Sequence, residues 1–175
     1  MSEKRIAWAI TGAGHTLEEC IDVLLNYDRV DLFLSRAGEE VLSMYNMEAR
    51  VQVPKIRIYQ EAKFSSPHVI RLFGGTYNVL VIAPATSNSV AKFACGISDT
   101  LVTNLFAQAG KSRIPVIVYP TDLKPIVDTI SPRGKPFKVY PRPIDLENTA
   151  KLRSFAGVTV VNNRQDLEQS LSNYV

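Results

Sequence analysis

Four short polar side chains follow an apolar segment in the middle of the chain. Residues 78–89 read NVLVIAPATSNS. The apolar run over 79–83 predicts a buried strand that ends at Pro84. A following helix needs one hydroxyl as its cap, but this loop offers several, which favours binding of a polyol chain or a phosphate. The polar side chains are Thr86, Ser87, Asn88 and Ser89.

A glycine-containing turn follows the first predicted strand, over 5–10. The turn reads Thr11-Gly12-Ala13-Gly14-His15. Glycines allow a sharp turn and a close approach to a ligand, and the next helix start offers N–H groups to an anion. His15 can contact a phosphate or simply begin its helix. Leu17 stands where the third glycine of a dinucleotide fingerprint would be, so a tight strand–helix turn is the alternative.

Hydroxyl and cationic groups follow the second predicted strand, over 30–34. Ser35 and Arg36 stand where an NAD site would place a carboxylate. They suit a phosphate instead, and an NADP-binding domain that uses Arg36 is one reading. Further along, the segment 96–99 includes Ser98 and Asp99, and Asp99 can cap the helix that follows.

The polar groups must be positioned by alternating strands and helices. This alternation predicts an α/β fold, a three-layer doubly wound (Rossmann- or flavodoxin-like) parallel sheet in a single domain over 1–175. A basic, proline-rich excursion is expected at about 120–143. Loops at the carboxyl ends of parallel strands meet at one edge of the sheet. The expected strands are 5–10, 30–34, 56–59, 79–83, 115–119 and 157–161, and the expected helices are 15–25, 38–47, 67–73, 87–95, 99–108, 145–155 and 164–171.

Composition narrows the class of protein. The chain has 175 residues, 46% of them hydrophobic and 21% charged, which is typical of a soluble globular protein. A net charge of +3 is too small to indicate a nucleic-acid partner. Cys20 and Cys95 both fall in apolar helical patterns and are expected to be reduced core thiols, with no zinc-ligand spacing and no metal site. We expect a cytoplasmic protein without a signal peptide or membrane span.

A flat polar ring, a polyol chain and a phosphate would suit these loops, and FMN has those parts. The segment PATSNS resembles the PASANT motif of the homo-oligomeric flavin-containing Cys decarboxylase superfamily. The 12–15 turn, Ser35 and the run GISDTLVTN at 96–104 also resemble that superfamily, in the same order. The resemblance covers about 4–125. TGAGH and the length are most similar to archaeal flavoproteins that accept electrons from ferredoxin and to dihydromethanopterin reductases.

The resemblance implies an FMN site and a position for a catalytic histidine. His68 falls where the decarboxylases keep their active-site histidine. Their PxMNxxMW motif is PTDLKP here, with Leu123 at the asparagine position, which argues against decarboxylation; flavin prenyl transfer is also disfavoured. The implied cofactor-binding residues are Gly12, Ala13, Gly14, His15, Ser35, Arg36, Ala85, Thr86, Ser87, Asn88, Ser98, Asp99, Thr103 and Asn104.

Two functions follow from this resemblance. In the first, the protein accepts electrons from an acidic ferredoxin, which docks on the basic segment 131–143, and passes them on. In the second, reduced FMN delivers a hydride to the C=N bond of a dihydropterin. The family also implies a homo-oligomer with FMN near a subunit interface, with contacts expected at 60–68 and 120–143. The cations of the basic segment are Arg133, Lys135, Lys138 and Arg142.

Overall fold

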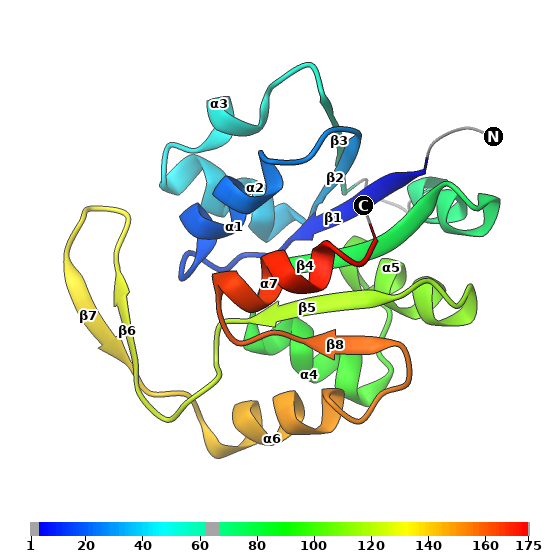
Figure 1. The fold of residues 1–175 in the computed structure, drawn as a ribbon. Helices are drawn as coiled ribbons and strands as arrows, with labels where there is room; N and C mark the ends of the chain where they lie inside the picture. Colours follow the sequence, from blue (N-terminus) through cyan, green and yellow to red (C-terminus); the bar gives the residue numbers. More distant parts are fainter. Residues whose placement is uncertain (1–3, 62–66, 175) are drawn as a thin grey trace.

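Six parallel strands form the central sheet. The computed structural model describes residues 4–61 and 67–174 of the chain. The strand order is β3-β2-β1-β4-β5-β8, so the direction of winding reverses between β1 and β4 (Figure 1). The predicted doubly wound parallel α/β fold is confirmed, and its switch point lies between these two strands. The strands are β1 (Arg5–Ile10), β2 (Val30–Leu34), β3 (Ile56–Gln60), β4 (Tyr77–Ala85), β5 (Val116–Pro120) and β8 (Val158–Val160).

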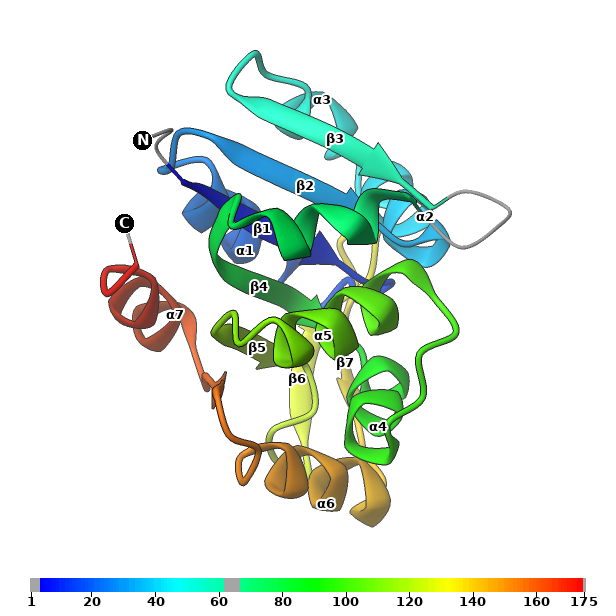
Figure 2. The same ribbon diagram turned by 90° about the vertical axis from the view of Figure 1, so that its right-hand side faces the viewer.

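Helices cover both faces of the sheet. Side chains of the strands alternate between two apolar cores, as the pleat requires. On β1, Ala7 and Ala9 enter one core, whereas Trp8 enters the other and donates its Nε1–H to the Ala83 carbonyl at 2.8 Å. One core is covered by α1 (Leu17–Leu24), α2 (Arg36–Met44), α3 (Glu48–Val51) and α7 (Arg164–Leu171). The other is covered by the 3-10 helix η1 (Pro67–Gly74), α4 (Ser87–Cys95), α5 (Leu101–Lys111) and α6 (Pro143–Leu152) (Figure 2).

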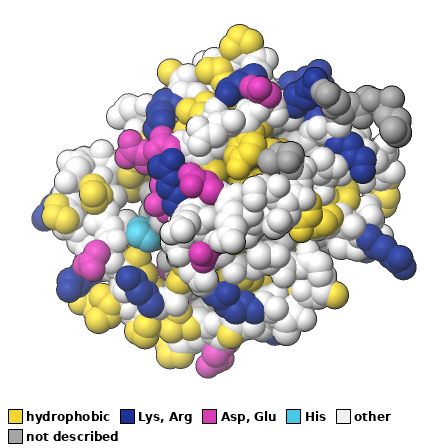
Figure 3. Space-filling model, viewed as in Figure 1, with side chains coloured by type: hydrophobic (Ala, Val, Ile, Leu, Met, Phe, Trp, Pro, Cys, Tyr) yellow, Lys and Arg dark blue, Asp and Glu magenta, His cyan; other side chains and the backbone are white. Residues whose placement is uncertain are grey.

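The basic excursion contains a β-hairpin that the sequence did not predict. Strands β6 (Val127–Ile130) and β7 (Pro136–Val139) pair antiparallel and project from the edge where the parallel strands end (Figure 1). Gly134 turns the chain between them with φ +76°. The side chains of Phe137 and Tyr140 are exposed, and apolar groups are visible at the surface on this side (Figure 3).

Two local expectations are wrong. Cys20 is buried, but Cys95 is exposed: it is the last residue of α4, whose neighbouring Phe93 and Ala94 are buried in the core. Asp99 does not cap α5; Thr100 does, accepting a hydrogen bond from the Thr103 N–H. None of the described helices is long and apolar enough to cross a membrane.

A buried carboxylate ties three strands together near their amino-terminal ends. Asp31 of β2 has no exposed surface. Its Oδ1 accepts from Arg5 Nε of β1 at 2.6 Å, and its Oδ2 accepts from the Tyr77 hydroxyl of β4 at 2.7 Å. These bonds compensate for the cost of removing the charge from water.

Removal of the Asp31 carboxylate should strongly destabilise the fold. Asp31→Ala leaves the Arg5 charge partly buried without its anion, so we expect the free energy of unfolding to fall by about 3–5 kcal/mol. Chemical denaturation measures this change. The matched control is Asp128→Ala, since Asp128 and Lys138 form an exposed pair at 3.9 Å; its loss should be at most about 1 kcal/mol. Equal losses in the two variants would contradict the prediction.

Candidate functional site

A single buried hydroxyl joins the loops that follow β1 and β4. Thr11 is 2% exposed. Its Oγ1 donates to the Pro84 carbonyl and accepts from the Thr86 N–H, each at 2.9 Å. The two loops on either side of the switch point are therefore fixed against each other, where ligands bind in sheets of this kind.

Some polar groups of the PATSNS loop form the start of a helix, and others remain available to bind a ligand. Thr86 caps α4, because its Oγ1 accepts from the Ser89 N–H at 3.2 Å and donates to Ser89 Oγ at 3.0 Å. Ala85 is fully buried. Ser87 and Asn88 occupy the first turn of α4, and Asn88 is exposed. Part of the polar run thus begins a helix, as the alternative interpretation allowed, and the first turn remains available for a ligand.

Packing against α2 requires the glycines of the turn after β1. A Cβ on Gly12 would lie 2.6 Å from the Ala37 Cβ, and a Cβ on Gly14 would overlap the Tyr45 ring. Ala13 is buried between them. The next helix, α1, begins after Thr16 without a side-chain cap. Its first turn therefore offers backbone N–H groups that no side-chain cap satisfies.

Ser35 and Arg36 lie at the start of α2. The Ser35 hydroxyl caps the helix, accepting from the Gly38 N–H at 3.0 Å. The side chain of Arg36 is exposed. The Glu61 carboxylate accepts from the Arg36 N–H at 3.1 Å and from the Leu101 N–H at 2.6 Å. It therefore occupies the positive ends of α2 and α5 together. The sequence analysis missed Glu61, although a carboxylate directly after a strand was a visible signal.

Side chains around the start of α5 are engaged locally. Asp99 is exposed and its Oδ1 and Oδ2 accept from Lys92 Nζ at 2.8 Å. Thr103 is buried within the capping box that it forms with Thr100. Asn104 donates to the Thr100 carbonyl at 3.0 Å. Ser98 is exposed beside Asp99. These contacts stabilise the start of α5 and the segment before it. The role of these residues in binding a cofactor stays a prediction.

His68 lies on η1 beside the outer strands. Its ring centroid is 4.8 Å from that of Tyr59, which stacks on Phe33 with centroids 5.1 Å apart. These rings belong to β2 and β3, on the far side of β1 from β4. The described contacts thus do not bring His68 to the PATSNS loop, and its catalytic role stays a prediction.

The loop after β5 adds a carboxylate that the sequence analysis did not select. The Thr121 N–H donates to the Ala85 carbonyl at 3.0 Å, which brings this loop against the PATSNS loop. The half-buried Asp122 carboxylate faces the Ser87 hydroxyl, and burial raises the pKa of this carboxyl group. His15 faces the same carboxylate, and burial lowers the histidine pKa. An acid and a base from two loops therefore meet at the candidate site.

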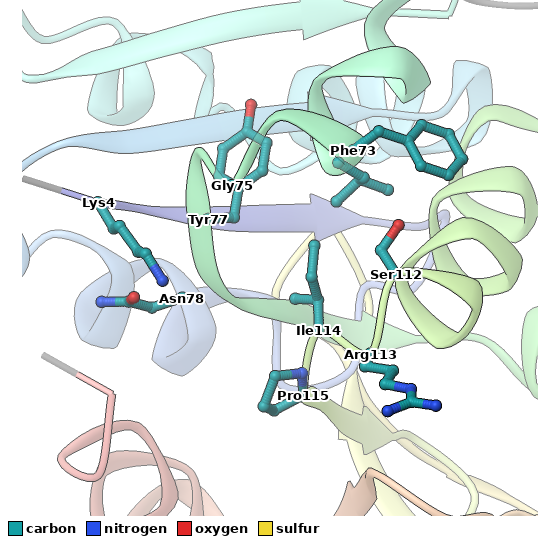
Figure 4. A pocket seen from close by; sticks show the side chains of 10 residues that line it. Lys4, Phe73, Gly75, Tyr77, Asn78, Ser112, Arg113, Ile114 and Pro115 are labelled. Atoms are coloured by element: carbon teal, nitrogen blue, oxygen red, sulfur yellow. The ribbon is translucent and has the colours of Figure 1, made fainter. Parts of the chain in front are cut away.

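Two of the cavities that described residues line lie at opposite edges of the sheet. A groove of about 550 Å³ runs between the start of α1 and the hairpin, with His15, Glu19 and Ile130 in its lining. A second pocket of about 370 Å³ lies at the opposite edge, where β4 and β5 begin (Figure 4). It contains the buried Ser112 Oγ, which has no partner among the described residues. The described residues contain no His, Cys, Asp and Glu group that could hold a metal ion.

Comparisons with known proteins identify the family. Residues 1–171 match the model of the Flavoprotein family. A protein of uncharacterized function from Methanocaldococcus jannaschii is 35% identical over 179 residues, covering 98% of this chain and 96% of the relative. A dihydromethanopterin reductase (acceptor) from Methanosarcina mazei is 44% identical over 137 residues, covering 71% of this chain. That match spans only 57% of the reductase.

One solved structure is similar over nearly its whole length. DmrB of Burkholderia xenovorans, solved in complex with FMN and described as a cubic protein cage for redox transfer, superposes with a TM-score of 0.90. It is 41% identical, and the match covers 98% of this chain and 95% of DmrB. The predicted resemblance to FMN flavoproteins of the flavin-containing Cys decarboxylase superfamily is confirmed. The chain belongs to the Flavoprotein family.

Proposed function

We propose that the whole chain, 1–175, acts as one redox domain that binds FMN at the carboxyl edge of the sheet. The observation that carries this proposal is the Thr11 bridge, which fixes the loops after β1 and β4 at the switch point. The FMN complex of DmrB supports the choice of cofactor. When bound, FMN supplies the electron-transfer and hydride chemistry, while the protein provides position and electrostatics.

The donor groups at this edge fit the parts of FMN. The exposed Asn88 amide and the Ser87 hydroxyl lie in the first turn of α4, whose backbone N–H groups point the same way. Such neutral groups suit a ribityl chain and a ring edge. The turn 12–14 and the uncapped start of α1 provide further donors for the phosphate side, and Ser35 lies beside them with its hydroxyl donating to the Ile10 carbonyl at 3.3 Å. Ala85 would contact FMN through its backbone, because its side chain is fully buried.

We propose that the protein reduces a dihydropterin. The identity to dihydromethanopterin reductases supports this reading, with 44% in the Methanosarcina mazei protein and 39% in that of Methanocaldococcus jannaschii. Leu123 replaces the asparagine of the decarboxylase motif, so the loop after β5 lacks the group expected for that chemistry. The groove beside His15, about 550 Å³ in volume, has room for a flat ring.

A second proposal concerns the source of electrons, an acidic ferredoxin-type donor in the cytoplasm. The exposed Arg133 and Lys135 lie in the turn between β6 and β7, and the Tyr45 hydroxyl holds this end of the hairpin by donating to the Ile130 carbonyl at 3.0 Å. The other two expected docking cations have carboxylates nearby: Lys138 is 3.9 Å from Asp128, and Arg142 is 2.7 Å from Asp145. Docking through the hairpin turn would therefore rest mainly on the first pair.

We also propose that the hairpin contacts a second copy of the chain. An isolated two-stranded hairpin is marginally stable in water, and this one exposes apolar side chains. A homo-oligomer would cover them and bring a neighbour close to the FMN edge. Light scattering should show an assembly larger than a monomer, and a monomer at micromolar concentration would contradict the proposal. The exposed apolar residues on and beside the hairpin are Ile126, Ile130, Phe137, Tyr140 and Ile144.

Replacement of Asn88 should weaken FMN binding. The purified protein should show flavin absorption bands, or acquire them when FMN is added. Asn88→Leu replaces a hydrogen-bonding group with an apolar one, so we expect the dissociation constant of FMN to rise about threefold to tenfold. Titration of the apoprotein with FMN measures it. The exposed Asn173→Leu, at the opposite end of the molecule, is the control. Equal affinity in both variants would argue against this placement of FMN.

Reversal of the hairpin-turn charges should slow electron delivery. In Arg133→Glu/Lys135→Glu, we expect the rate of FMN reduction by reduced ferredoxin to fall about tenfold at low salt, and less at high salt. Anaerobic stopped-flow absorbance measures the rate. Lys111→Glu/Lys151→Glu changes the net charge equally at exposed sites elsewhere. An equal effect in both double variants would show that only the net charge of the protein matters, and would contradict docking at the hairpin turn.

A further inference from the structure

His15 faces charged groups of both signs from two elements. It lies in the loop after β1, half-buried, immediately before the start of α1. Burial lowers its pKa most, Glu19 of α1 and Asp122 after β5 raise it, and Lys124 lowers it. Two more charges, Asp145 and Arg142, face Asp122. His15 also lines the groove of about 550 Å³ between the start of α1 and the hairpin, so its imidazole can reach a ring that is bound there.

These surroundings disfavour a phosphate beside His15. Two carboxylates already face the imidazole, and a phosphate carries close to two negative charges at neutral pH. Like charges at this range repel one another in a half-buried site. The neutral donors after β1, β2 and β4 are a better environment for the phosphate, which leaves the imidazole for another role.

Asp122 is held in place, and its charge is not matched by a direct ion pair among the described contacts. Its carbonyl accepts from Thr149 Oγ1 at 3.4 Å, and its carboxylate faces the neutral Ser87 hydroxyl. Two other carboxylates at this edge have direct cationic partners, since Asp99 binds Lys92 and Asp145 binds Arg142. The charge of Asp122 therefore acts on the imidazole beside it.

We propose that His15 is the proton donor of the reductase, with Asp122 and Lys124 setting the pH range in which it works. This inference rests on the proposed reduction of a dihydropterin. Reduced FMN, when bound, would supply the hydride, with its two electrons, for the carbon of the C=N bond. His15, as the imidazolium, donates its proton to the nitrogen, becomes neutral and is reprotonated from water. Asp122 is a positioning residue that favours the charged imidazole.

Replacing Asp122 and replacing Lys124 should shift the pKa of His15 in opposite directions. Asp122→Asn removes a charge that raises the His15 pKa, so that pKa should fall. Lys124→Gln removes a charge that lowers it, so the pKa should rise. The chain has only two histidines, so proton NMR titration of the FMN-loaded protein resolves His15 from His68 once His15→Gln assigns the signals.

The kinetic test compares two electron acceptors. The reduced, FMN-loaded protein is mixed with a dihydropterin, which needs a proton, or with ferricyanide, which takes electrons alone. His15→Gln should lower the ratio of the dihydropterin rate to the ferricyanide rate about a hundredfold. The dihydropterin rate of the unaltered protein should fall as pH rises through the His15 pKa, because the imidazolium is lost. That decline should move to lower pH in Asp122→Asn and to higher pH in Lys124→Gln.

Each outcome has a distinct meaning. Asp28→Asn, an exposed carboxylate before β2 that lies 3.7 Å from Lys55, is the control and should change neither the ratio nor the pH profile. An unchanged ratio in His15→Gln, or pH profiles that stay in place in both neighbour variants, would overturn the role of His15 while leaving the reductase intact. If dihydropterin does not reoxidise the unaltered protein, the proposed function fails, and the proton-donor role fails with it.

Discussion

The Thr11 hydroxyl is the interaction on which the site depends. Parallel strands on either side of a switch point diverge into helices on opposite faces, so their loops have no reason to stay together. Here one buried hydroxyl donates a hydrogen bond to the Pro84 carbonyl of the loop after β4 and accepts another from the Thr86 N–H of the same loop. Because Thr86 also caps α4, the bridge fixes the start of that helix relative to the turn after β1.

The small residues of this edge are required for packing before any ligand binds. Ser35, Thr86 and Thr100 each accept a bond from a backbone N–H in the first turn of a helix. Gly12 and Gly14 allow α2 and Tyr45 to approach the chain closely. A cap and a ligand contact both need a short polar side chain at a strand end, so sequence reasoning cannot separate them. The structure separates them by showing which hydroxyls are already engaged.

Local sequence patterns predicted the sheet and its helices because apolar runs and helical periods reflect burial directly. The hairpin was missed, since its strands are short and exposed, and only Gly134 in a proline-rich stretch marked the turn. Cys95 was misplaced because a helical period does not show that the final residue of a helix is exposed while its neighbours Phe93 and Ala94 stay buried. Glu61 and Asp122 were not selected because their neighbours are distant in sequence. Glu61 accepts from the Leu101 N–H and Asp122 faces Ser87, and such pairs become visible only when the loops meet.

The strand order explains why His15 and Asp122 can act together. β4 lies between β1 and β5, so the loops after the two outer strands of this trio both reach the start of α4. Helix caps and buried bonds make the walls of the site insensitive to pH. The imidazole and the carboxylate are different, since each is half-buried and burial moves their pKa values toward each other. A rigid edge that carries this titrating pair would suit the proposed proton transfer to a bound ring, because the acid must keep its position while its charge changes.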